Sequence, residues 1–163
     1  MRGVHNFPLF LFLLFSLGLV GCGLTLDQKK QSSTPNLFAK IDRSPCIGEC
    51  PVFSLAIYFD GTAVFYGKKN TNTIGEKNLK LSKNQLLQIS DEFTRKGFLI
   101  MNDSCCDCHD ADGASSSVIT YQGNGPYKQL KNYHGCSSLR SKELIELEDI
   151  ILELTGVRVL IDK

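Results

Sequence analysis

The residues with the most reactive side chains in this chain are cysteines and histidines in its second half. The segment DSCCDCHDAD holds three cysteines and a histidine within five positions, and another histidine and cysteine follow downstream. The residues concerned are Cys105, Cys106, Cys108, His109, His134 and Cys136. Thiolates and imidazoles are ligands that Zn²⁺ prefers, and a tetrahedral site needs four of them. A zinc site is therefore one interpretation of this cluster.

Disulfide bonds are the second interpretation, and the sequence favours them. Seven cysteines are present, and six remain if Cys22 carries lipid, as argued below. An even number of cysteines in an exported protein is typical of a disulfide framework. The spacing also matches no common zinc-ligand pattern. Cys105 and Cys108 have the C-x-x-C spacing of thiol oxidoreductases, but no helical pattern follows that would lower a thiol pKa.

Local geometry favours one disulfide and leaves the others open. Cys46 and Cys50 flank Ile-Gly-Glu, and a tight reversal there would bring their Cα atoms within about 6 Å, which suits a disulfide. The other four cysteines can pair in more than one way. One consistent set is Cys105 with Cys108 and Cys106 with Cys136. Exchanging partners within the cluster fits almost as well.

The chain shows no complete catalytic set. It contains no Gly-rich phosphate loop, no nucleophile elbow and no zinc-protease pair of histidines. His134 could be catalytic, but the spacing places no partner beside it, and a loop histidine is the simpler interpretation. We therefore expect a non-enzymatic protein without a cofactor. The alternative is a thiol-redox or zinc protein that uses the cluster of Cys105 to His109 with His134 and Cys136.

The start of the chain predicts export and lipid attachment. Residues 1–21 carry a positive charge near their start, at Arg2. A nearly unbroken run of Leu, Phe and Val follows over residues 7–20 and is too short to span a bilayer comfortably. The run ends in Leu-Val-Gly-Cys, which has the form of a bacterial lipobox. We expect cleavage just before Cys22 and acylation of its thiol, for example by palmitate. Each buried methylene contributes about 0.8 kcal/mol, so two or three acyl chains would hold the protein to a membrane.

The rest of the chain divides into a tether and a domain. Residues 22–36 are polar and predict a flexible, lipid-anchored tether. Residues 37–163 predict one domain of roughly 125 residues, enough to bury about two-thirds of its unfolded surface. Without residues 1–21, basic and acidic residues balance at 17 each. Such a balance, with no Lys/Arg cluster, argues against nucleic acid as a partner. The expected location is the bacterial cell envelope, with an unidentified protein or envelope partner.

Residues 45–67, PCIGECPVFSLAIYFDGTAVFYG, predict a cysteine-bearing turn and a β-hairpin. Apolar residues alternate with small or polar ones from Val52, and Asp60-Gly61 marks the reversal. Two loop lengths are possible. A two-residue loop would bury Val64 and Tyr66 of the second strand, whereas a three-residue loop closed by Gly61 would bury Ala63 and Phe65 instead. We predict the longer loop because it gives one continuous apolar face. That face consists of Phe53, Leu55, Ile57, Ala63 and Phe65.

Two amphipathic helices follow in the pattern. The first begins at Ser82, where Gln85 completes a capping box, and the second runs from Ser138 or Ser141 to Gly156. The apolar stripes are Leu86, Ile89 and Phe93 in the first helix and Leu144, Leu147, Ile151 and Leu154 in the second. Glu143, Glu146, Glu148 and Glu153 lie among the second stripe.

Further strands complete the expected fold. Residues 68–78 allow a third strand, residues 115–121 and 127–133 predict a second hairpin, and residues 157–161 predict a short last strand. The order is hairpin, helix, hairpin, helix. We therefore predict an α+β domain whose mostly antiparallel sheet of two hairpins carries both helices on one face.

The first hairpin also carries a motif of the form Pro-Cys-x-Gly-x-Cys-Pro, then alternating apolar residues, Asp-Gly, and an aromatic residue two positions before a glycine. The matching residues are Pro45, Cys46, Gly48, Cys50, Pro51, Phe53, Asp60, Gly61, Phe65 and Gly67. This motif resembles the opening of a bacterial domain family of unknown function whose members are often exported or lipid-anchored. Looser matches are Asp112, Lys131 to Gly135 and Leu147-Glu148. The resemblance covers roughly residues 41–156 and implies a fold type, but no activity.

Overall fold

The computed structural model describes residues 36–104, 106, 108, 113–123 and 125–162. These residues belong to one compact unit, Ser33–Lys163. The predicted signal peptide, Cys22 and nearly all of the predicted tether lie outside the described residues. Within the described ranges, no helix is long and apolar enough to cross a membrane.

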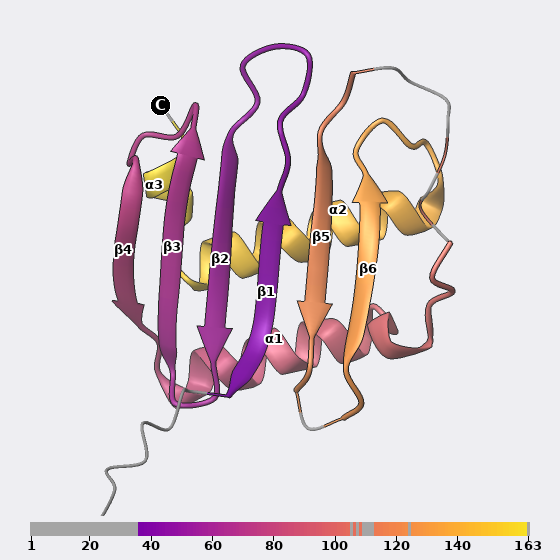
Figure 1. The fold of residues 1–163 in the computed structure, drawn as a ribbon. Helices are drawn as coiled ribbons and strands as arrows, with labels where there is room; N and C mark the ends of the chain where they lie inside the picture. The colour runs from indigo at the N-terminus through magenta and orange to yellow at the C-terminus, as the bar shows by residue number, and fades with distance from the viewer. Residues whose placement is uncertain (1–35, 105, 107, 109–112, 124, 163) are drawn as a thin grey trace, which may run out of the picture. The chain divides into compact units, whose positions relative to one another are not determined.

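A six-stranded sheet, antiparallel throughout, forms one layer of the domain (Figure 1). Its order is β4-β3-β2-β1-β5-β6. The strands are β1 (Leu37–Arg43), β2 (Val52–Tyr58), β3 (Thr62–Lys69), β4 (Gly75–Lys80), β5 (Ser116–Tyr121) and β6 (Lys128–Tyr133). Strand β1 pairs with both β2 and β5, so the first strand of the domain lies at the centre of the sheet.

Helices form the second layer. The helices α1 (Lys83–Arg95) and α2 (Leu139–Leu154) cover one face of the sheet, and the other face is open (Figure 1). A 3₁₀ turn, η1 (Phe98–Ile100), follows α1, and the short α3 (Arg158–Ile161) follows α2. The core lies between the layers. Its largest fully buried side chains include Phe53, Phe65, Phe93, Ile119, Leu130, Leu144 and Leu147.

The predicted hairpin register is confirmed. Leu55 pairs with Phe65 and Ile57 with Ala63, so that all the predicted apolar residues of both strands are buried. The turn is closed by Gly61, whose φ is +82° and whose backbone N–H donates to the carbonyl of Tyr58 at 2.9 Å. A positive φ is cheap only for a residue without Cβ, which is why Asp-Gly is a strong hairpin signal.

The helix starts are also confirmed. The Ser82 hydroxyl accepts from the backbone N–H of Gln85, and the Gln85 side chain accepts from the Ser82 backbone N–H, which is the predicted capping box. Ser138, one of the two predicted starts, caps α2. Both helices bury the stripe of residues that the 3.6-residue period selects, apart from partly exposed residues at its ends.

Three strand predictions need correction. No strand was predicted over Leu37–Arg43, although β1 is central. The third strand, expected within residues 68–78, is β4 (Gly75–Lys80), and residues 71–73 before it form a bend. Residues 158–161 form α3 instead of a last strand, because Val157 and Ile161 bury their side chains one helical turn apart. The α+β class and the antiparallel sheet stand, but four strands, and not two, precede α1.

Candidate functional site

A cluster of polar side chains lies between α2 and the sheet, with Ser117 and Glu148 fully buried and Arg43 and His134 partly buried. Arg43 at the end of β1 and Ser117 in β5 are directly paired in the sheet register. Glu148 projects from the buried side of α2 and His134 follows β6. Arg43 donates to Glu148 Oε1 from Nε at 2.9 Å, with Nη2 at 2.7 Å from the same oxygen. Ser117 Oγ lies 2.6 Å from Glu148 Oε2 and 2.7 Å from His134 Nε2.

The electrostatics of the cluster favour a charged carboxylate. Burial by itself raises the pKa of Glu148, because a low-dielectric surrounding disfavours the ion. The hydrogen bond from His134, the positive charge of Arg43 and the hydroxyl of Ser117 act in the opposite direction and prevail. The pKa of Glu148 therefore lies below its ordinary value, and the side chain is an anion at neutral pH.

The hydrogen bonds define what this cluster can do chemically. Ser117 has one hydroxyl proton, which it donates to the carboxylate of Glu148. Its oxygen then accepts from His134 Nε2, so this imidazole nitrogen is a donor and cannot take the serine proton. A nucleophilic serine needs the reverse arrangement, with the imidazole as acceptor. Ser117 and Glu148 are also both 0% exposed. In this arrangement the Ser117 hydroxyl is not activated for attack on a substrate, and the cluster links β1, β5 and α2.

The cysteines form disulfides that only partly match the sequence prediction. Cys46 pairs with Cys50, with Cα atoms 5.7 Å apart, which is the pairing suggested by the turn between them. Cys108 pairs with Cys136, with Cα atoms 5.8 Å apart. The set with Cys106 joined to Cys136 is therefore wrong, and an exchange of partners within the cluster, also left open by the sequence, gives the observed pair. Beside this bond, the backbone N–H of Tyr133 donates to the carbonyl of Cys106 at 3.2 Å.

The predicted metal ligands are brought together only in part. Cys105 and His109 lie outside the described residues, Cys106 is disulfide-bonded, and the remaining sulfurs are bonded to each other. His134 Nε2 contacts Ser117. In the part of the chain that the structure describes, no group of three or more His, Cys, Asp or Glu side chains could hold a metal ion. Zinc binding would require reduction of the disulfides first.

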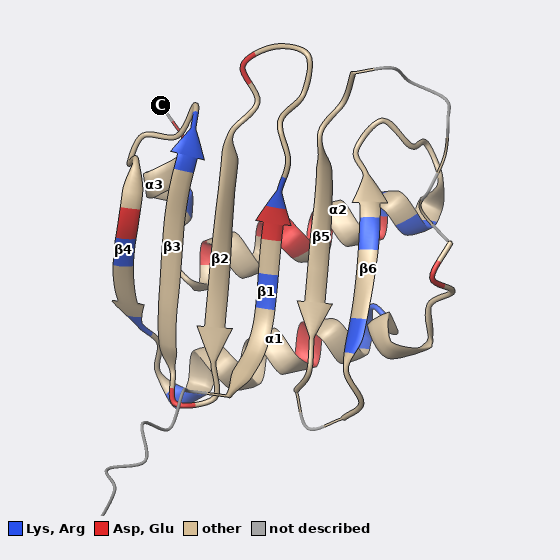
Figure 2. Ribbon diagram, viewed as in Figure 1, with Lys and Arg blue, Asp and Glu red and all other residues tan. Residues whose placement is uncertain are grey.

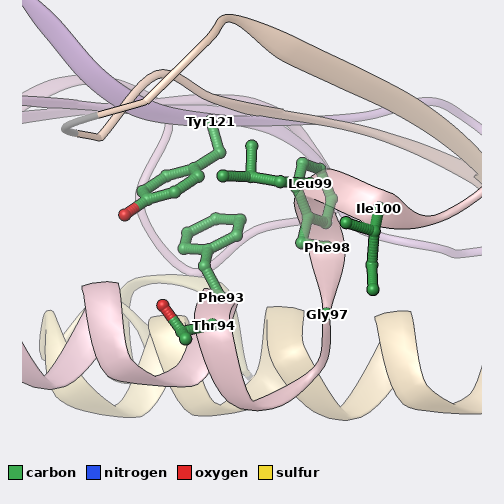
Figure 3. A pocket seen from close by; sticks show the side chains of 7 residues that line it. All are labelled: Phe93, Thr94, Gly97, Phe98, Leu99, Ile100 and Tyr121. Atoms are coloured by element: carbon green, nitrogen blue, oxygen red, sulfur yellow. The ribbon is translucent and has the colours of Figure 1, made fainter.

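A small apolar hollow of about 190 Å³ lies at the end of α1 (Figure 3). Phe93 stacks on Tyr121 with ring centroids 3.9 Å apart, and Phe98 meets Phe93 edge-on. The Tyr121 hydroxyl is hydrogen-bonded to Ser90 at 2.9 Å. Leu99 and Ile100 complete the lining. Ligand pockets usually have about 300–1,000 Å³, so this hollow has room for little more than one side chain.

A larger groove of about 550 Å³ lies at the ends of several strands. Its lining consists of Asp42, Arg43, Ser44, Pro45, Val52, Lys68, Ser116, Val118 and Lys131. Next to Pro45, hydrogen bonds between Ser44 and Ser116 continue the pairing of β1 with β5 one residue beyond the end of β1. Ser44 donates from its N–H to the carbonyl of Ser116, and its hydroxyl accepts from the Ser116 N–H at 2.9 Å. The volume is in the range of ordinary ligand sites.

These features define a class of protein: a two-layer α+β domain with an antiparallel sheet, a disulfide-closed loop before its second strand and a closed polar cluster behind the sheet. Residues 38–155 match the family described as Domain of unknown function (DUF6438). The chain belongs to this family. No curated protein matches the chain.

Most of the polar cluster was not predicted from the sequence. Arg43 and Ser117 were not singled out, and Glu148 was noted only among the charged residues of α2 and as a looser family match. One signal was present: Glu148 stands four residues after Leu144 and three before Ile151, on the apolar stripe itself. A carboxylate at such a position must find buried donors, since an unpaired buried charge is strongly destabilising.

Proposed function

We propose that this protein is a lipid-anchored component of the bacterial cell envelope whose α+β domain binds a partner or serves a structural role, without catalysing a reaction. The lipobox that ends in Cys22 supports the anchor. The observation that carries the non-enzymatic role is the closed polar cluster. It is where Ser, His and Glu side chains meet, and its serine and carboxylate are fully buried and bonded to each other.

The anchor is tested with Cys22→Ala in the full chain, expressed in a bacterial host supplied with labelled palmitate. We expect label in the wild-type protein, and a variant that carries none and keeps its first 21 residues. The matched control is Cys46→Ala/Cys50→Ala, which removes thiols elsewhere and leaves the lipobox intact. If the Cys22 variant is processed and partitions into detergent as the wild type does, the lipoprotein assignment fails.

The alternative function is a thiol-redox or zinc protein centred on Cys105, Cys106, Cys108, His109, His134 and Cys136. It is separated from the first proposal by counting free thiols in the native protein and by elemental analysis for zinc. We expect no free thiols and no stoichiometric zinc, because the described cysteines of the cluster are in disulfides. One zinc per chain, with three or more titratable thiols, would favour the alternative.

A further inference from the structure

The charges of the domain are divided between its two layers. The six strands carry eight Lys and Arg residues against two Asp and Glu, whereas α2 carries two basic and five acidic residues. Figure 2 shows this division, with basic positions on the strands and acidic positions on α2 behind them. A chain whose overall composition is balanced therefore has a positively charged sheet. The count of charges along the sequence does not reveal this.

The open face of the sheet carries part of that excess. Ile41, Phe65 and Leu130 are buried against the helices, so their neighbours in β1, β3 and β6 point to the open side. The neighbours include Lys68 and Lys131, which line the groove. Both side chains are exposed, so this face of the sheet presents positive charge to a partner.

The acidic residue in the groove does not cancel this potential. Asp42 is paired with Lys40 at 2.7 Å, so this pair has no net charge. Neither Lys68 nor Lys131 makes an ion pair with any residue that the structure describes. Arg43 is neutralised by the buried Glu148. The groove is thus left with two uncompensated cations, one on each side of a floor that contains Val118.

The distance between the backbones of the two strands that carry the lysines indicates the form of the ligand. Strands β3 and β6 are separated by β2, β1 and β5, so roughly 19 Å lies between their backbones at the usual spacing of about 4.8 Å. An extended peptide advances about 3.3 Å per residue, so about six residues would cross the sheet from Lys68 to Lys131.

We propose that the groove of the open sheet face, between Lys68 and Lys131, binds an extended acidic peptide segment of a partner protein. The inference deepens the proposed binding role and rests on it. Carboxylates of the peptide pair with the two lysines, and its backbone crosses the apolar floor at Val52 and Val118. Such rim charges direct association and give it a strong dependence on ionic strength.

The test uses fluorescein-labelled octaglutamate and the full-length lipidated protein in a neutral detergent, with fluorescence anisotropy at about 50 mM salt. An eight-residue peptide is long enough to bridge the lysines. We expect saturable binding that Lys68→Glu/Lys131→Glu weakens at least about tenfold, and that weakens in the wild type at about 500 mM salt. A neutral Gly-Ser octapeptide should not bind.

The matched control is Lys83→Glu/Lys142→Glu, which changes the net charge equally at two exposed positions on the helix layer. We expect this pair to retain nearly all of the affinity. Equal weakening by both pairs would overturn the proposal, because it would show attraction by net charge alone. Absence of octaglutamate binding, or lysine-dependent binding of polyphosphate without binding of the peptide, would also overturn it. Detergent partition of the groove variant measures the anchor separately, so failure of one proposal does not decide the other.

Discussion

Glu148 places a negative charge between α2 and the sheet, where Arg43, Ser117 and His134 surround it. Taking a carboxylate and a guanidinium out of water is costly, and replacing such a pair by apolar residues is often neutral or stabilising. We therefore expect the pair to add little net stability while linking β1 to α2. Removing only one partner is destabilising, since the other charge then remains largely out of water without a counter-ion.

The first prediction concerns this charge. Glu148→Gln leaves the largely buried Arg43 guanidinium without its counter-ion and should lower the free energy of unfolding by about 2–3 kcal/mol. The measurement is urea unfolding at pH 7. Glu153→Gln, on the same helix but largely exposed and paired with Arg158, is the control and should lower it by less than about 1 kcal/mol. Similar small losses from both changes would mean that the cluster does not hold α2 on the sheet.

The second prediction is the pH dependence of that stability. The pKa of Glu148 is lower in the folded chain than its ordinary value of 4.5, so its carboxylate stabilises the fold at pH values above 4.5. That contribution falls as the pH drops below 4.5, because the unfolded chain then takes up a proton that the folded chain does not, and it is fully lost once the pH is below the folded-state pKa. Urea unfolding at pH 7, 5 and 3.5 should show wild type and Glu148→Gln converging in acid. A difference in unfolding free energy that stays constant over this pH range would contradict a lowered pKa for Glu148.

The third prediction concerns the hairpin turn. Gly61→Val should lower the free energy of unfolding by more than about 1 kcal/mol, because a β-branched residue resists positive φ. A Cβ at this position would also stand 2.5 Å from the carbonyl oxygen of Leu81. Asp60→Asn is the control, since an amide oxygen can still accept from the Thr62 N–H. Thermal unfolding of both variants is the measurement. Equal, small shifts in melting temperature would show that the turn does not need glycine.

At the scale of elements, the two disulfides have different tasks. Cys46–Cys50 spans only four positions and shapes the loop between β1 and β2. Ile47 in that loop donates from its N–H to the carbonyl of Gly113, so the loop also contacts the segment before β5. Cys108–Cys136 spans 28 positions and fastens the segment after η1 to the turn between β6 and α2.

The fourth prediction follows from these loop lengths. Cys46→Ser/Cys50→Ser should lower the free energy of unfolding by about 1–2 kcal/mol, and Cys108→Ser/Cys136→Ser by about 3–4 kcal/mol, because closing a longer loop removes more entropy from the unfolded chain. Denaturant unfolding measures both. Hydrogen exchange should show loosened protection in β2 for the first variant.

Peptide mapping of a non-reduced digest is the independent check on connectivity. A peptide that links Cys46 or Cys50 to the 105–108 segment would contradict the local pairing, as would equal stability losses from the two double variants. Such a linked peptide would mean that a disulfide joins the two halves of the domain.

At the scale of the whole molecule, β1 joins two groups of strands that are separate in the sequence. Strands β2, β3 and β4 lie on one side of it, and β5 and β6 on the other. The helices then cover both groups from one side (Figure 1). Because β1 pairs on both edges, its removal would expose the backbone groups of β2 and β5 and the apolar face beneath them.

The fifth prediction tests this central position. A chain that starts at Ser44 should not unfold cooperatively, whereas a chain that starts at Asn36 should keep a sigmoidal thermal transition, because it retains β1. Circular dichroism and near-ultraviolet spectra of the two chains provide the measurement. A cooperative transition in the shorter chain would show that the sheet closes without β1.

The amino-acid sequence by itself determined the local parts of this protein. The register of the β2–β3 hairpin, the capping box at Ser82 and the stripes of both helices were all predicted correctly. Each depends on contacts within a few residues: a buried face with period two, a hydroxyl that satisfies a nearby N–H, and apolar side chains one helical turn apart. Such signals are complete within the segment that carries them.

Only the tertiary structure decided which distant segments meet. Arg43 and Glu148 are 105 positions apart, and Ser117 comes to Arg43 because β1 enters between β2 and β5. The partner of Cys136 and the positive charge of the sheet depend on the same arrangement. The same local signals are compatible with several orders of strands. The observed order is selected because it buries the apolar residues of all the elements in one common core. The polar cluster and the groove therefore exist only where the layers have packed.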